Sequence, residues 1–228
     1  MLADGLACAA FEQFLNEYPL DGDSVIEGER RRLRRDVRTW IEDDWDDGRP
    51  RAFIAAERWF GKPTAAAIPT DEGPLFVVGR IDRTDVAGGI TLVRDLKTGR
   101  PRPREREQAD ANVDIDLQLA LYVAVATGLA SEWAIPPEVA AAYAYVDRFA
   151  PVRERAFRVD RAALQGAGAG WFALAMALIR GRLFVRTPRP SDCGICPFSP
   201  VCGDDPAGSL ERLRDATGAL GTFRDLKG

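Results

Sequence analysis

The segment from Gly79 to Gly99, GRIDRTDVAGGITLVRDLKTG, constrains the fold more than any other part of the chain. Two strand-like runs flank a Gly-Gly pair, which predicts two strands joined by a tight turn. Asp82 lies in the first strand, and Asp95 and Lys97 lie near the end of the second. Because strand side chains alternate between faces, Asp95 and Lys97 share a face, and pairing across the turn brings Asp82 beside Asp95. The hairpin therefore predicts two carboxylates and one ammonium in one site.

Converging carboxylates are the ligands that hard cations such as Mg²⁺ or Mn²⁺ prefer, and a water bound to such a cation is a potential nucleophile. Lys97 would position that water or neutralise charge on a phosphate. The alternative is a surface hairpin with ordinary flanking charges, which are common. The lysine content favours a site, since lysine is rare among the 31 basic residues and occurs only as Lys62, Lys97 and Lys227.

The motifs GRIDR, DLKTG and then QLALY follow one another in the order of a known family. They resemble the RecB-type branch of the PD-(D/E)XK nucleases over about residues 57–202. The resemblance implies a restriction-endonuclease-like α/β fold, with a mixed central sheet from about Phe53 to Val159 flanked by helices. It also implies a single nuclease domain over residues 1–228, with its catalytic core at about 53–159.

The resemblance assigns roles to individual residues. It makes Asp82 and Asp95 metal ligands, with Glu57 assisting, and it makes Lys97 the group that orients the nucleophile. The helical Q-x-x-x-Y match implies that Gln118 orients a substrate phosphate or a metal-bound water, with Tyr122 alongside. A solvent-facing strand glutamate and a core helix are the alternatives for Glu57 and for the helix.

Four cysteines predict a second cofactor. Cys193, Cys196 and Cys202 form C-x₂-C-x₅-C, which in a cytosolic protein indicates a metal or cluster site rather than disulfides. Cys8 begins CAAFEQFL, a predicted helix start that resembles the first cluster segment of AddB-type nucleases. Four thiolates suit zinc or a four-iron cluster, and the resemblance favours [4Fe-4S]. Such a cluster would join the N-terminal helix to the segment before the tail at 204–228; a buried Cys8 and three surface thiols are the alternative.

The composition excludes several classes of site within this chain. There is no histidine, which rules out a Ser-His-Asp triad and a histidine-metal nuclease. Many RecB-like nucleases carry a metal-binding histidine on a helix that would correspond to residues 29–45, and here it has no counterpart. No Walker loop is present, so a helicase motor would be a separate polypeptide.

Candidate DNA contacts follow the second strand of the hairpin. Arg100, Arg102 and Arg104 alternate with prolines, which keep a loop extended enough for guanidinium groups to reach phosphates. An exposed disordered loop is the alternative. The predicted helix at 29–45 carries an arginine stripe that we interpret as a solvated face, and the net charge of −4 argues weakly against DNA binding.

Hydrophobic patterns place the remaining elements. Strands are predicted at 52–60, 75–78, 140–146 and 152–159, and helices at 116–129, 162–183 and 209–228. No stretch is apolar and long enough to span a bilayer, and the start MLADGLAC lacks the features of a signal peptide, so a cytoplasmic location is expected.

Together these observations predict a metal-dependent DNA nuclease, an exonuclease acting in DNA repair or recombination with a helicase as its partner. A non-catalytic DNA-binding or scaffolding subunit of a helicase–nuclease is one alternative. A four-cysteine zinc protein without nuclease activity is another.

Overall fold

The computed structural model describes residues 2–46, 50–98, 117–147, 150–153, 158–160, 162, 164–183, 208, 211 and 213–227. The chain divides into two compact units. The first comprises Met1–Ala66 and Val78–Leu164, and the second comprises Ala67–Val77 and Gln165–Gly228. Within the described ranges, no helix has the length and apolar character needed to cross a bilayer.

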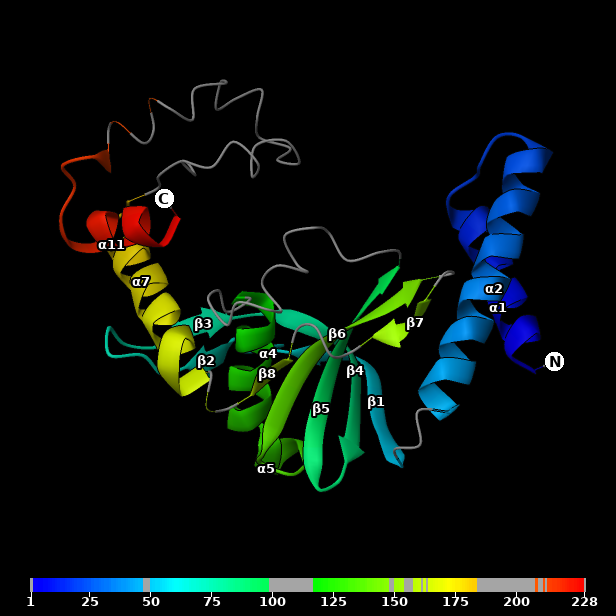
Figure 1. Cartoon of the computed structure of the whole chain (residues 1–228), viewed down its shortest axis with the longest axis horizontal. Helices are drawn as coiled ribbons and strands as arrows, with labels where there is room; N and C mark the ends of the chain where they lie inside the picture. Colours follow the sequence, from blue (N-terminus) through cyan, green and yellow to red (C-terminus); the bar gives the residue numbers. More distant parts are fainter. Residues whose placement is uncertain are drawn as a thin grey trace. The chain divides into compact units, whose positions relative to one another are not determined.

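The first unit contains most of the helices and strands (Figure 1). In chain order these are α1 (Leu2–Glu17), α2 (Asp23–Asp46), β1 (Arg51–Phe60), β4 (Gly79–Ala87), β5 (Ile90–Thr98), α4 (Leu117–Gly128), α5 (Ala130–Trp133), β6 (Val139–Asp147), β7 (Ala150–Arg153) and β8 (Arg158–Asp160).

A mixed sheet forms the centre of this unit. Its order is β1-β4-β5-β6-β7, and β8 also pairs with β6. Strands β5 and β6 are parallel, whereas the other pairs are antiparallel. The predicted mixed α/β sheet is therefore confirmed. The predicted hairpin is present too: β4 and β5 meet at Gly88 and Gly89, whose φ angles of 59° and 81° lie in the region that favours glycine.

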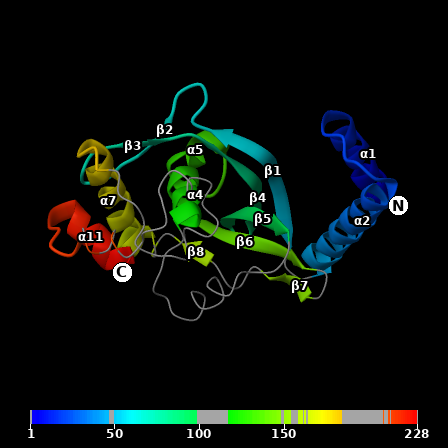
Figure 2. The same ribbon diagram turned by 90° about the horizontal axis from the view of Figure 1, so that it is seen from above.

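Helix α4 provides the crossover that two parallel neighbours require. It follows β5, precedes β6, and packs against the sheet, as Figure 2 shows from above. Its composition is strongly apolar, and Leu119, Val123 and Val125 are among its buried side chains. Because a crossover helix returns past the strand that precedes it, the first turn of α4, which carries Gln118, lies near the carboxyl end of β5.

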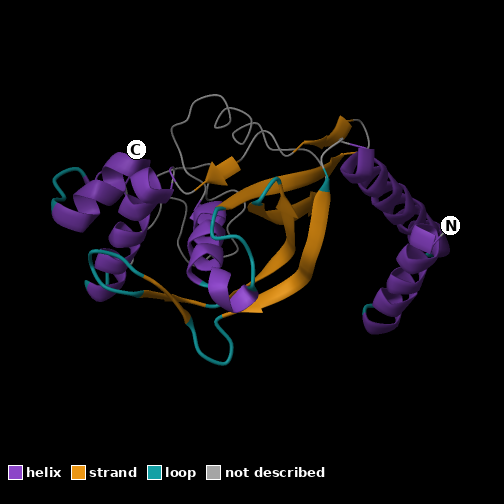
Figure 3. Cartoon of the chain, turned by 90° about the horizontal axis from the view of Figure 1, so that it is seen from below, coloured by secondary structure: helices purple, strands orange, loops and turns teal. Residues whose placement is uncertain are grey.

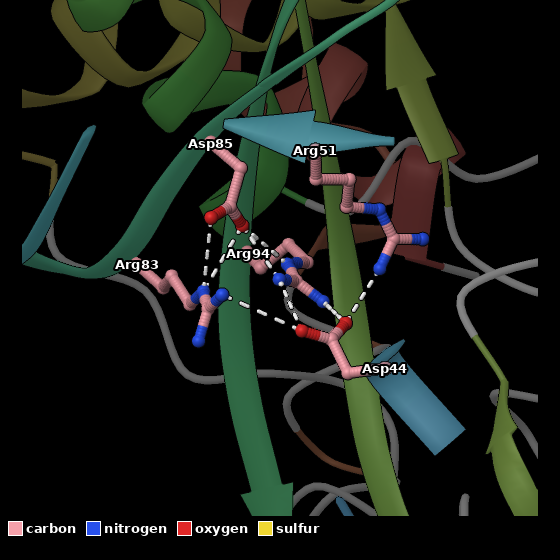
Figure 4. Close-up of polar contacts among 5 residues, drawn as sticks. All are labelled: Asp44, Arg51, Arg83, Asp85 and Arg94. Carbon is pink, nitrogen blue, oxygen red and sulfur yellow. Dashed lines mark hydrogen bonds and ion pairs between the residues drawn. The ribbon is translucent and has the colours of Figure 1, made fainter. Parts of the chain in front are cut away.

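The opposite face of the sheet carries a buried charge network formed by Asp44, Arg51, Arg83, Asp85 and Arg94 (Figure 4). Arg94 and Asp85 are fully buried, and Arg94 donates to Asp85 through Nε at 2.9 Å. Asp44, near the end of α2, pairs with Arg94, with Arg51 at 2.5 Å and with Arg83 at 3.4 Å. A carboxylate buried among guanidinium groups is compensated, and here it fixes the end of α2 to the sheet.

Helices α1 and α2 form an antiparallel pair joined by residues 18–22. Arg30 of α2 contacts Glu12 of α1 at 2.5 Å, and Arg38 contacts Asp4 at 2.8 Å. The stripe arginines at 31, 34, 35 and 38 are exposed, as expected for a solvated face, although two of them, Arg34 and Arg38, also pair with Asp4 of α1. The pKa of the Asp4 carboxyl is lowered by the hydrogen bond from Arg38.

Figure 3 shows the helices and strands as the structure has them, and several of their boundaries differ from those expected. Helix α1 begins at Leu2, so Cys8 lies within the helix rather than at its start. Helix α2 begins six residues earlier than the apolar pattern indicated, at Asp23. In the region 152–159 the structure has β7 and β8, with residues 154–157 outside the described ranges. The predicted helix at 162–183 is a π-helical turn, Leu164–Gly168, followed by α7 (Ala169–Arg180).

The second unit is smaller. Its elements are β2 (Ala66–Ile68), β3 (Leu75–Val77), α7 and α11 (Gly218–Lys227); β2 pairs with β3, and α7 contacts α11. Strand β3 confirms the strand predicted at 75–78. The turn between β2 and β3 is closed by Gly73, whose φ is 102° and whose amide donates to the Thr70 carbonyl.

Candidate active site

Asp82 and Asp95 lie where the β4–β5 ladder ends. Arg83 and Arg94 form the last pair of that ladder towards this end, and the two aspartates are the next residue on each strand. Beyond this point the backbone amide of Leu96 donates to Asp82 Oδ2 at 2.9 Å instead of to the β4 backbone. The end of the ladder therefore brings the two predicted carboxylates together.

Asp95 is the buried carboxylate of the pair, with 4% of the residue exposed. Its Oδ1 accepts a hydrogen bond from Gln118 Nε2 at 2.7 Å, and its Oδ2 lies 2.5 Å from Lys97 Nζ. Burial raises the pKa of the Asp95 carboxyl and the charge of Asp82 adds to that rise, while Lys97 opposes it. Lys97 is thus the counter-charge that offsets part of the cost of ionising Asp95.

Gln118 and Tyr122 stand one turn apart on α4 and face Asp95. Gln118 Nε2 also lies 3.0 Å from the Tyr122 hydroxyl, which in turn lies 3.2 Å from the Arg80 carbonyl and 3.5 Å from Asp95 Oδ1. Burial raises the pKa of Tyr122, so the phenol is protonated near neutral pH and donates a hydrogen bond. The predicted Q-x-x-x-Y pair is therefore joined to the acidic site by direct contacts.

Tyr143 of β6 belongs to the same cluster and was missed by the sequence analysis. Its hydroxyl donates to Gln118 Oε1 at 3.2 Å, and Lys97 Nζ lies 5.0 Å from its ring centroid. In the parallel register Tyr143 is opposite Asp95 and Tyr145 is opposite Lys97. The signal was available, because two tyrosines with a spacing of two interrupt an alanine-rich strand and must share one face.

The structure does not bring all the predicted site residues close to Asp82 and Asp95. Glu57 is exposed, has φ of 53°, and pairs with Arg80 at 2.8 Å. No three acidic, cysteine or histidine side chains among the described residues lie close enough to form a metal site. A role for Glu57 as a ligand therefore stays a prediction.

The other predicted site residues fall partly outside the described ranges. Of the four cysteines only Cys8 is described, as a free and partly buried thiol in α1. The remaining predicted positions, Arg100, Arg102, Arg104, Cys193, Cys196 and Cys202, lie outside those ranges.

The Asp82–Asp95 pair fits a divalent cation by the chemistry of its donors. Two carboxylates meet one ammonium, which leaves a negative charge next to the buried Asp95. Among the described residues only the Leu96 amide bonds to Asp82, and only Lys97 contacts Asp95 Oδ2. Carboxylate oxygens are the ligands that Mg²⁺ prefers, and Mg²⁺ completes its coordination with water and with substrate phosphates.

Comparison with known proteins places the chain in a family. No curated protein sequence matches the chain. The model of the PD-(D/E)XK nuclease superfamily, however, matches residues 2–203, which include every element that builds the site. The chain therefore belongs to the PD-(D/E)XK nuclease superfamily.

Proposed function

We propose that this protein is a Mg²⁺- or Mn²⁺-dependent DNA nuclease that hydrolyses phosphodiester bonds, and that it is an exonuclease of the RecB type. The observation that carries the proposal is the contact between Lys97 and Asp95 beside Asp82, on the two strands that the D…D-x-K pattern singled out. Membership of a nuclease superfamily supports it.

The roles of the residues follow from their contacts. Asp82 and Asp95 would hold the cation, which supplies a Lewis acid for the phosphate and acidifies a bound water. Lys97, 39% exposed at its side chain, reaches solvent and would orient the attacking water or donate to a phosphate oxygen. Gln118 holds Asp95 by a hydrogen bond, and Tyr122 holds Gln118. The network thus preorganises the carboxylate before the substrate arrives.

A helicase–nuclease partnership and a [4Fe-4S] cluster are further parts of this proposal. The cluster would be held by Cys8, Cys193, Cys196 and Cys202, and the spacing of the last three is its main support. Zinc is the alternative for the same donors. The arginines at 100, 102 and 104 would contact the DNA backbone next to the metal site.

A cleavage assay with matched lysine variants tests the proposal. Single- and double-stranded DNA labelled at one end is incubated with the full chain, with and without Mg²⁺. Lys97→Ala and Asp95→Ala should each reduce cleavage by about a hundredfold or more, since each removes a group that acts on the transition state. Lys227→Ala, at the end of α11, is the matched control and should cleave as the wild type does. Unchanged cleavage by both site variants would contradict the assignment.

A further inference from the structure

A tryptophan and two basic side chains form an exposed cluster beside the active site. Trp59, at the end of β1, is 50% exposed. Lys62 Nζ lies 3.4 Å from its ring centroid, and Arg80 Cζ lies 5.6 Å from it. We call Trp59, Lys62 and Arg80 the Trp59 platform.

The sheet places this platform close to the carboxylates. Trp59 is the register partner of Arg80 in β4, so the two side chains leave the sheet on the same side. Arg80 precedes Asp82 by two residues, which in a strand is a separation of about 7 Å. The carbonyl of Arg80 also lies 3.2 Å from the Tyr122 hydroxyl of the active site.

Packing beneath the platform fixes its position. Phe60, the next residue of β1, points to the opposite side of the strand from Trp59; it is buried there, and its ring meets Tyr122 edge-on with the centroids 6.4 Å apart. The Phe60 ring also covers Gly79, where an added Cβ would come within 2.4 Å of the ring. The strand ends that carry Trp59 and Arg80 are therefore held against the catalytic helix.

The platform is not explained by the stability of the fold. A half-exposed indole contributes less burial than a core aromatic does, and exposed cation–π contacts are weak. Arg80 is paired with Glu57 at 2.8 Å, whereas Lys62 makes no ion pair among the described residues. Both cations lie over the indole ring, and an aromatic ring with mobile basic side chains over it can stack a base and hold the adjoining phosphates once the Lys62 ammonium moves aside.

We propose that the Trp59 platform binds a single-stranded segment of the DNA substrate. One base takes the place of the Lys62 ammonium on the Trp59 ring, and Lys62 and Arg80 contact the phosphates on either side of that nucleotide. Stacking of this kind tolerates any base but needs a base whose face is free, which a duplex interior does not offer. The site would thus favour single strands and frayed ends. This inference rests on the proposed function, because it takes DNA as the substrate.

Binding in EDTA tests the inference without cleavage. A fluorescein-labelled single-stranded oligonucleotide is titrated with the full-length chain, and anisotropy is measured. Trp59→Ala should weaken binding about tenfold, whereas Trp59→Phe should stay close to the wild type because a ring remains. Phe53→Ala is the matched control: Phe53 is 59% exposed on the same strand, opposite Asp85 at the far end of the pairing. It should bind as the wild type does.

The salt dependence of binding distinguishes the contribution of the basic side chains from that of the Trp59 ring. Lys62→Gln should lower the slope of log affinity against log salt by about one, since one phosphate contact is lost. Trp59→Ala should leave the slope unchanged while reducing the affinity.

An abasic scan identifies the stacked nucleotide. A single abasic site is moved along the oligonucleotide, and one position should weaken binding to the wild type about tenfold. The same abasic site should have no effect on Trp59→Ala, because its stacking partner is already absent. Equal effects in both proteins, wild-type affinity of Trp59→Ala, or no binding of single strands by the wild type would each overturn the inference.

The nuclease function and the Trp59 platform can be contradicted by different results. Binding through Trp59 without any Mg²⁺-dependent cleavage would contradict only the nuclease function. Cleavage that depends on Lys97, together with unchanged single-strand binding by Trp59→Ala, would contradict only the platform.

Discussion

The buried carboxylate of Asp95 depends on three neighbours from two elements. Lys97 of β5 offsets its charge, and Gln118 and Tyr122 of α4 donate towards its Oδ1. Because burial and Asp82 both raise its pKa, each donor that is lost raises that pKa further. The population of the ionised carboxylate, the form that would bind a cation, thus depends on hydrogen bonds from the helix.

Tyr122→Phe tests this dependence. The variant keeps the ring that packs against Phe60 and removes only the hydroxyl. Cleavage should fall about tenfold, as expected for a lost positioning contact. The hydroxyl lowers the pKa of Asp95, so its removal should shift the acidic limb of the pH–rate profile to higher pH. Tyr18→Phe, at the exposed residue that follows α1, is the control and should change neither quantity.

Gly79→Ala tests the close packing below the site. The added Cβ would lie 2.4 Å from the Phe60 ring, so the ring must move and Tyr122 with it. We expect a loss of about 1–3 kcal/mol in the free energy of unfolding and reduced cleavage. Adding Phe60→Leu to Gly79→Ala should recover part of both. Gly28→Ala, where the new Cβ meets no atom within 4 Å, should not lower stability. A Gly79→Ala protein as stable as the wild type would contradict this packing argument.

At the scale of elements, the sequence predicted what local patterns encode. The Gly88-Gly89 pair fixed the hairpin, and the alternation of Asp95 with Leu96 indicated which side chains share a face. The apolar helix with Gln118 and Tyr122 was predicted because its composition and spacing are local properties. The residues that share the candidate site's face of the sheet could therefore be predicted from the sequence.

Polar pairs between residues far apart in the sequence could not be predicted in the same way. Arg94 is fully buried within a strand, although a single sequence would place an arginine at the surface. Its partner Asp44 is 50 residues away in the sequence and belongs to helix α2. The pairing of Glu57 with Arg80 depends likewise on the register of β1 against β4, which no local pattern encodes. Partners of this kind become visible only once the sheet is assembled.

Asp44→Asn tests whether the charge network anchors α2. Burial raises the pKa of the Asp44 carboxyl, but the hydrogen bond and charge of Arg94 and the charges of Arg51 and Arg83 outweigh burial, so the pKa is lowered. Losing this charge leaves buried guanidinium groups uncompensated. We expect a loss of about 3 kcal/mol in the free energy of unfolding at pH 7, measured by urea denaturation.

The pH dependence of that loss has a definite sign. A folded pKa below the unfolded one means that the carboxylate stabilises the protein above about pH 4, and that this contribution is lost as the pH falls through the folded pKa. The stabilities of the wild type and Asp44→Asn should therefore converge in acid. Glu42→Gln, an exposed change on the same helix, should follow the wild type at every pH. A constant difference down to pH 3 would show that the loss is not electrostatic.

At the scale of the whole molecule, the family model matches the chain from residue 2 to residue 203. That range includes all four cysteines, at positions 8, 193, 196 and 202. A cluster that uses all four would close a loop over most of the chain. Such closure restricts the unfolded state, and the free energy of metal binding becomes free energy of folding.

Cys8→Ser tests this proposed closure. If the four thiolates hold one [4Fe-4S] cluster, anaerobically purified wild-type protein is brown and contains iron and sulfide in equal amounts. Cys8→Ser should lose most of both and melt at a markedly lower temperature, although Asp95 and Lys97 are unchanged. Ala9→Ser, an exposed neighbour on α1, controls for a serine in this helix and should keep the cluster. Zinc in place of iron would give the same mutational pattern without colour or sulfide. Full metal content and an unchanged melting temperature in Cys8→Ser would contradict the closure and leave Cys8 as a partly buried thiol of α1.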